Sequence, residues 1–384
     1  MAERTATECV RVDLWHRTTG CPLLSIRAFS FIVTTYTRPL LLRCFSMRIA
    51  VLGLGFMGST HLKALRSIPG AELAAVYSGD PVKLSGDLSS IQGNIGGPGE
   101  KLDFTGVAKY TSIPDLLADS SIDAVDICLP TNLHAEVAIQ ALRSGKHVLL
   151  EKPMALDMAE ARRVLAAAAE HKRVLMTAQV LRFFPMYRAL RETLSSGVLG
   201  PVRAASFRRR CAAPGWSRWL ADPELSGGGV FDLLIHDVDM CLHLFGKPES
   251  VCATGYEAMA SGIDVITADL FYPGQFVVTV AGGWHHPKAF PFSMEYTVVS
   301  DGGTIDYSSS GTPPTLYRMN GEKELLPMTE IDGYAAEIAY FLECCRSGNS
   351  PELCPPAESA EAVAVTRLLL EAREKKGERI KCHN

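Results

Sequence analysis

A carboxylate and an imidazole stand four residues apart just after three glycines, in the stretch GGGVFDLLIHDVDM at residues 227–240. These two residues are Asp232 and His236, and in a helix this spacing places them one turn apart on the same side. An imidazole titrates near neutral pH and can take up or release a proton. The pair therefore suits the wall of a site where protons are transferred.

The apolar residues of the stretch predict a helix. They recur at helical spacing, at Phe231, Ile235, Val238 and Leu242. A neighbouring ionisable stripe is formed by Asp232, His236, Asp239 and His243. Ordinary surface polarity, with Asp232 stabilising the helix dipole, is the competing interpretation. We predict no metal, because zinc on Asp232 and His236 would lack its third and fourth ligands.

Length and composition limit the classes of protein to which the chain can belong. At 384 residues, 47% hydrophobic and 21% charged, the chain is expected to be globular with two domains. A net charge of −4 argues against nucleic acid or a membrane surface as partner. No apolar run is long enough to predict a membrane-spanning helix. The eleven cysteines form no C-x-x-C pair, which favours reduced thiols and a cytoplasmic protein.

The first 46 residues differ from the rest, with six arginines, no lysine and no sustained period. We expect residues 1–46 to be a disordered extension or an upstream start outside the fold. An arginine-rich transit peptide is the alternative.

A glycine turn opens the folded part, where MRIAVLGLGFMG begins with a strand at residues 49–52. Gly53, Gly55 and Gly58 follow in G-x-G-x-x-G spacing, ahead of a helical pattern. The glycines allow a tight turn, close approach to a pyrophosphate and helix packing. We predict that this turn, including Phe56 and Met57, binds NAD or NADP.

The second strand does not decide between the two cofactors. Its tip carries Ser78, with Asp80 two residues later, where an acid would select NAD. The Gly-rich segment 83–107 is either a loop over the cofactor or a solvated insertion.

Further strand–helix alternation up to residue 150 predicts a parallel sheet, and we assign 47–165 to a Rossmann domain. Ligands of such sheets bind at the carboxyl ends of the strands. Pro130, Thr131 and Asn132 follow one predicted strand, and Glu151, Lys152 and Pro153 follow the next. Residues 166–384 instead contain period-two strands, which predict an α+β domain with an open, mostly antiparallel mixed sheet and a C-terminal helix.

Five motifs in this order carry a family resemblance: GLGFMG, LPTNLHAEVAI, SGKHVLLEKP, LRFFP and GGGVFDLLIHDVD. From Met47 to about residue 375 the chain resembles the Gfo/Idh/MocA oxidoreductases, typified by glucose-fructose oxidoreductase and inositol dehydrogenases. The departures are the first 46 residues, the long loop and Ser78. The resemblance implies an NAD(P)-dependent enzyme, a small carbohydrate or polyol substrate, and a homo-oligomer, either dimer or tetramer.

The resemblance also implies residue roles. Lys152, Asp232 and His236 match the catalytic set, in which the lysine supplies a cation and the histidine a base. Asn132 and His134 would lie near the nicotinamide and Glu151 at its ribose, although Asn132 could instead cap a helix.

Three further substrate contacts are predicted less directly: Arg182, Asp239 and Trp284. A structural ion pair is the alternative for Arg182, and packing is the alternative for Trp284 and the adjacent His285 and His286.

The sequence thus predicts a dehydrogenase that oxidises a secondary ring hydroxyl of a sugar, inositol or glycoside. A redox-neutral glycoside hydrolase with bound NAD and a non-catalytic nucleotide sensor are the alternatives.

Overall fold

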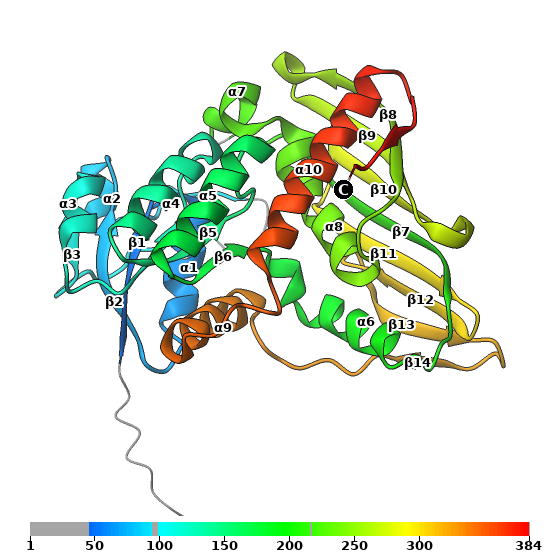
Figure 1. The fold of residues 1–384 in the computed structure, drawn as a ribbon, viewed down its shortest axis with the longest axis horizontal. Helices are drawn as coiled ribbons and strands as arrows, with labels where there is room; N and C mark the ends of the chain where they lie inside the picture. Colours follow the sequence, from blue (N-terminus) through cyan, green and yellow to red (C-terminus); the bar gives the residue numbers. More distant parts are fainter. Residues whose placement is uncertain (1–45, 94–98, 216, 384) are drawn as a thin grey trace, which may run out of the picture. The chain divides into compact units, whose positions relative to one another are not determined.

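The computed structural model describes residues 46–93, 99–215 and 217–383, and the interpretation of residues 1–45 lies outside them. Two β-sheets organise this part of the chain (Figure 1).

The first sheet has six parallel strands in the order β3-β2-β1-β4-β5-β6. Its strands are Met47–Leu52 (β1), Ala71–Tyr77 (β2), Ala108–Tyr110 (β3), Ala124–Ile127 (β4), His147–Glu151 (β5) and Leu175–Ala178 (β6). This is the strand order of a dinucleotide-binding fold, with its switch point between β1 and β4. The predicted parallel sheet is confirmed.

Both faces of this sheet are buried, which explains the continuous apolar run of β1. Ile49 and Val51 pack on one face, toward α1 and α9, whereas Ala50 and Leu52 pack on the other, toward α3, α4 and α5. The helices of this half are Phe56–Leu65 (α1), Pro81–Leu84 (α2), Ile113–Ala118 (α3), His134–Arg143 (α4), Met158–His171 (α5) and, much later in the chain, Gly333–Ser347 (α9).

The predicted domain boundary at residue 165 needs correction. It falls inside α5, and the parallel sheet continues to β6 at Ala178. In addition, α9 returns from the C-terminal part to pack against α1. The sequence pattern missed this because a strand period does not say which sheet the strand joins.

The second sheet has nine strands in the order β14-β13-β12-β11-β7-β10-β9-β8-β15, and only the β7–β10 pair is parallel. Its strands are Val202–Cys211 (β7), Ser250–Ala258 (β8), Ile263–Phe271 (β9), Val277–Trp284 (β10), Ser293–Ser300 (β11), Gly303–Ser308 (β12), Thr312–Arg318 (β13), Lys323–Leu325 (β14) and Ile380–Lys381 (β15). The predicted mostly antiparallel mixed sheet is confirmed.

Helices lie on one face of this sheet (Figure 1). They are Pro185–Ser195 (α6), Gly229–Phe245 (α8) and Pro356–Glu374 (α10), and the short helix Pro223–Ser226 (α7) comes just before α8 in the chain. The short helices of the described chain are Thr131–Leu133 (η1), Val180–Arg182 (η2), Trp219–Ala221 (η3), Met259–Ser261 (η4) and Pro273–Gln275 (η5). The predicted apolar stripe of α8 is buried, from Phe231 to Leu242. Within the described ranges, no helix has the length and apolar character needed to cross a bilayer.

Candidate active site

A cavity of about 600 Å³ lies at the carboxyl ends of β1, β4 and β5, and α8 contributes to its wall. Gly53, Gly55, Phe56 and Met57 line it on the glycine-turn side. Lys152, Asp232 and His236 line it together, although 80 residues separate the lysine from the aspartate. The fold thus brings the three predicted catalytic residues to one cavity.

The glycine turn has the geometry that a dinucleotide needs. Gly53 has a φ of +99°, and a Cβ there would press on the main chain of Cys128. A Cβ at Gly58 would collide with the carbonyl oxygen of Gly53, whereas a Cβ at Gly55 would meet no atom within 4 Å. The open side of Gly55 at the N-terminus of α1 therefore leaves room for a pyrophosphate beside free N–H groups.

Lys152 and Asp232 form an ion pair on the cavity wall. The Lys152 ammonium lies 3.0 Å from Oδ1 of Asp232 and also donates to the main-chain oxygen of Asp232 at 2.8 Å. The two side chains are 13% and 18% exposed, so both remain accessible from the cavity. The pair places a held cation where a substrate oxygen can approach.

His236 is a neutral imidazole on the same wall. Burial, together with the charges of Lys152 and Arg209, holds the pKa of His236 well below its ordinary value. Its Nδ1 atom is buried and has no hydrogen-bond partner among the described residues. A neutral imidazole with an unused nitrogen can accept a proton.

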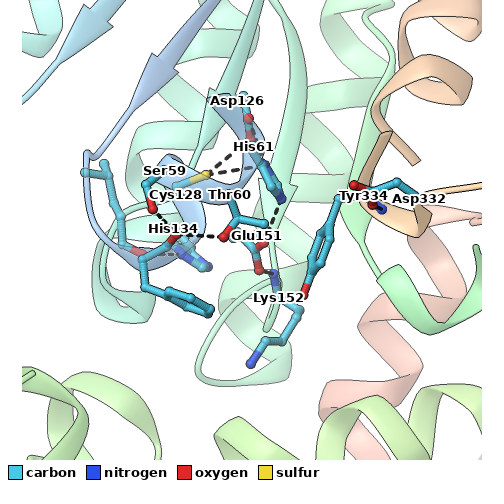
Figure 2. Close-up of polar contacts among 12 residues, drawn as sticks. Ser59, Thr60, His61, Asp126, Cys128, His134, Glu151, Lys152, Asp332 and Tyr334 are labelled. Atoms are coloured by element: carbon cyan, nitrogen blue, oxygen red, sulfur yellow. Dashed lines mark hydrogen bonds and ion pairs between the residues drawn. The ribbon is translucent and has the colours of Figure 1, made fainter. Parts of the chain in front are cut away.

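Figure 2 shows Glu151 and His134 on the side of Lys152 away from its ammonium group. The main-chain N–H of Lys152 donates to Oε2 of Glu151 at 2.9 Å, and Glu151 lines the cavity. The ring nitrogens of His134 lie 2.7 Å from the carbonyl oxygen of Pro153 and 2.8 Å from that of Leu129. His134 thus ties together the chain segments that follow β4 and β5, and it is not part of the cavity lining.

Two other predicted cofactor contacts lie away from the cavity lining. The Ser78 hydroxyl is buried and accepts from the N–H of Asp80, whose carboxylate caps α2 through Val82. Asn132 caps neither η1 nor α4, whose N-cap residues are Pro130 and Leu133. At this edge the cavity is lined by Pro130 and Thr131.

Arg182 and Asp239 form a buried ion pair, not a pair of substrate contacts. Two bonds of 2.8 and 2.7 Å join the guanidinium to the carboxylate, and the side chains are 0% and 1% exposed. Arg182 also donates to Glu358 at 2.6 Å. Neither member of the pair lines the cavity, so we remove both from the substrate site.

Trp284 lines the cavity, as predicted for a substrate contact. It is only 2% exposed and packs directly over Gly229. His285 and His286 lie outside the lining, and the His286 ring stacks on Phe290.

Several residues that line the cavity were not predicted as site residues from the sequence. Arg209 is held by two bonds to Asp237, at 2.7 and 3.0 Å, and its place in a period-two strand carried no signal of function. Tyr334 reaches the cavity from α9. Lys83, Ser90, Ile91 and Gln92 also line it, which favours a cofactor-side location for the described part of the long loop.

One group of described residues has the donor types of a metal site, namely His61, Asp126 and Cys128, with ligand atoms within 4.8 Å of one another. However, Nδ1 of His61 lies 2.8 Å from Oδ2 of Asp126, a hydrogen-bond distance. Ligand atoms around tetrahedral zinc are about 3.4 Å apart. The Cys128 thiol also donates to Asp126, so the three residues form a hydrogen-bonded cluster.

The glycine turn, the parallel sheet and the lysine–aspartate–histidine wall define a nicotinamide-dependent oxidoreductase. The sequence model of the oxidoreductase family with an NAD-binding Rossmann fold matches residues 47–179, and that of the GFO/IDH/MocA C-terminal domain matches residues 187–306. The chain belongs to the GFO/IDH/MocA family, and it is an NAD(P)-dependent oxidoreductase.

Curated relatives and solved structures agree with this assignment. The scyllo-inositol 2-dehydrogenase (NAD(+)) of Bacillus subtilis (strain 168) is 27% identical over 79% of this chain and 88% of the relative. The 1,5-anhydro-D-fructose reductase of Ensifer adhaerens is 38% identical over 64% of this chain and 76% of the relative. A probable dehydrogenase from Thermotoga maritima has the same fold, with a TM-score of 0.71 at 24% identity over 87% of this chain and 98% of that one.

Proposed function

We propose that the protein oxidises a secondary ring hydroxyl of a sugar, inositol or glycoside, with Lys152, Asp232 and His236 as its catalytic residues. The observation that carries the proposal is the shared wall, where the Lys152–Asp232 ion pair at 3.0 Å and His236 line the same cavity as the glycine turn.

Each residue has a role that its contacts support. When bound, the nicotinamide would take up the hydride released from the carbinol carbon. His236 would accept the hydroxyl proton, because it lines the cavity and its lowered pKa keeps it neutral. Lys152 would stabilise the negative charge that develops on the oxygen. Asp232 holds Lys152 in place rather than orienting His236.

The substrate class rests on the walls and on the relatives. The aromatic side chains of Trp219, Trp284 and Phe292 line the cavity. Such faces pack against the C–H surfaces of a sugar or cyclitol ring. The names of the two curated relatives, an inositol dehydrogenase and an anhydrofructose reductase, support a cyclic polyol or sugar.

Two further features are proposed with the function. We place the enzyme in the cytoplasm, since no disulfide joins the cysteines that the structure describes. We also propose a homo-oligomer, either dimer or tetramer, that buries the face of the nine-stranded sheet opposite α8 and α10.

The test is the near-ultraviolet absorbance of reduced nicotinamide, recorded with NAD or NADP over a panel of inositols, aldoses and aryl glycosides. The proposal predicts a rise with one cofactor and one group of substrates. Release of the aglycone without any rise would instead identify a redox-neutral hydrolase. Binding of the cofactor without turnover of any compound would identify a nucleotide sensor.

A further inference from the structure

A buried cluster of ionisable side chains contacts Glu151, the residue that comes just before Lys152. His61, on α1, lies between two carboxylates (Figure 2). Its Nδ1 is 2.8 Å from Oδ2 of Asp126, and its Nε2 is 3.2 Å from Oε1 of Glu151. The second contact is an ion pair without the alignment of a hydrogen bond. The three side chains are 0%, 0% and 6% exposed, so little solvent screens them.

The side chains of this cluster shift one another's pKa values and so determine which of them are charged. Burial lowers the pKa of His61, but the contacts with Asp126 and Cys128 together outweigh burial, and the pKa lies well above its ordinary value. Burial raises the pKa of Glu151, and the contact with His61 together with the charge of Lys152 lowers it below its ordinary value. The cluster is therefore an imidazolium between two carboxylates.

The other ionisable groups that face His61 have pKa values shifted toward their neutral forms. On α9, Tyr334 has its ring 6.1 Å from that of His61, and burial raises the pKa of its phenol. Burial and the nearby Glu151 and Asp126 raise the pKa of the Glu337 carboxyl well above its ordinary value. Burial likewise raises the pKa of the Cys128 thiol. Lys152 is directed toward Asp232, and His61 is the cation in direct contact with both Asp126 and Glu151.

We propose that His61 is a positioning residue of the active site, which fixes both the direction and the negative charge of the Glu151 carboxylate. One oxygen of Glu151 faces His61, and the other accepts the main-chain N–H of Lys152. The inference rests on the proposed function in one respect, the assignment of Glu151 to the nicotinamide side of the cavity.

A fixed carboxylate on that side has a measurable consequence. The oxidised nicotinamide ring is cationic and the reduced ring is neutral, so a negative charge favours the oxidised form. Without His61, two buried carboxylates would share the cluster, and one of them would take up a proton. The preference for the oxidised form would then fall.

The first experiment measures dissociation constants for the oxidised and the reduced cofactor by titration calorimetry, in the wild type and in His61→Gln. We expect the ratio of the two constants to shift on the order of tenfold against the oxidised form. The matched control is His243→Gln, because His243 is also shielded from solvent but faces Glu358, which does not line the cavity, and its ratio should stay at the wild-type value. Equal weakening of both forms in His61→Gln would indicate a merely structural role and overturn the proposal.

A second experiment needs neither the variant nor turnover. Nitrogen-15 NMR of the ring nitrogens in the cofactor-free wild type should find both nitrogens of His61 protonated at pH 7.5. A neutral imidazole at that pH would overturn the proposal. Failure of the wild type to bind any nicotinamide cofactor would contradict the proposed function instead, and the NMR result would still decide the state of His61.

Discussion

His236 differs from an ordinary histidine because its surroundings keep it neutral. Burial and two nearby cations, Lys152 and Arg209, hold its pKa well below the usual value. A base is active when it is unprotonated, so a lowered pKa extends activity toward acid pH. Lys152 and Asp232 stay paired beside it and provide the complementary charge.

This predicts the pH dependence of kcat/KM. As the pH falls through about 6.5, where a free imidazole would protonate, His236 should remain neutral and kcat/KM should not decline on its account. The measurement is the pH profile of kcat/KM in the wild type and in His236→Ala. An acid limb near pH 6.5 that disappears in His236→Ala would contradict the neutral state described here.

At the scale of elements, the Arg182–Asp239 pair joins η2 to α8, and Glu358 extends it to α10. A buried charge left without its partner typically costs about 3–5 kcal/mol of stability. Because Arg182 would keep its contact with the partly exposed Glu358, we expect Asp239→Ala to lower the free energy of unfolding by about 3 kcal/mol, the lower end of that range. Chemical denaturation followed by circular dichroism measures it.

The same variant tests the reassignment of this pair from substrate binding to structure. The substrate KM of the folded Asp239→Ala protein should stay close to the wild-type KM. A large increase in KM without loss of stability would return Asp239 to the substrate site.

Helices and contacts within one element could be predicted from the sequence, whereas contacts between distant elements could not. The period of residues 231–242 predicts α8 and its buried stripe because helix geometry is local. The meeting of Lys152 with Asp232 followed only from the family resemblance, since 80 residues separate them. Tyr334 and Glu337 could not be predicted near the site, because a helical period does not say that α9 packs on the first sheet.

At the scale of the whole molecule, the helices of the described residues cover one face of the nine-stranded sheet, and exposed apolar side chains lie on the other. Val299 pairs with Thr304, and Thr304 pairs with Tyr317, so these side chains share one face. Val299 and Tyr317 are 39% and 43% exposed. Large exposed apolar patches commonly mark contacts between subunits.

We therefore expect the double variant Val299→Glu, Tyr317→Glu to shift the protein toward the monomer, because apposed carboxylates disfavour burial of the face. Light scattering coupled to size-exclusion chromatography measures the mass. The matched control is Val82→Glu, an exposed apolar position on α2 that should leave the mass unchanged. A wild-type protein that is monomeric at micromolar concentration would contradict the proposed assembly.

We propose that Lys152 and His236 carry out the chemical step at a preformed cofactor site. The most direct test is the rate of nicotinamide reduction in Lys152→Ala and His236→Ala, with cofactor dissociation constants measured on the same samples. We predict a loss of kcat of at least about 100-fold in each variant, while both variants still bind the cofactor. Wild-type kcat in either variant would contradict it.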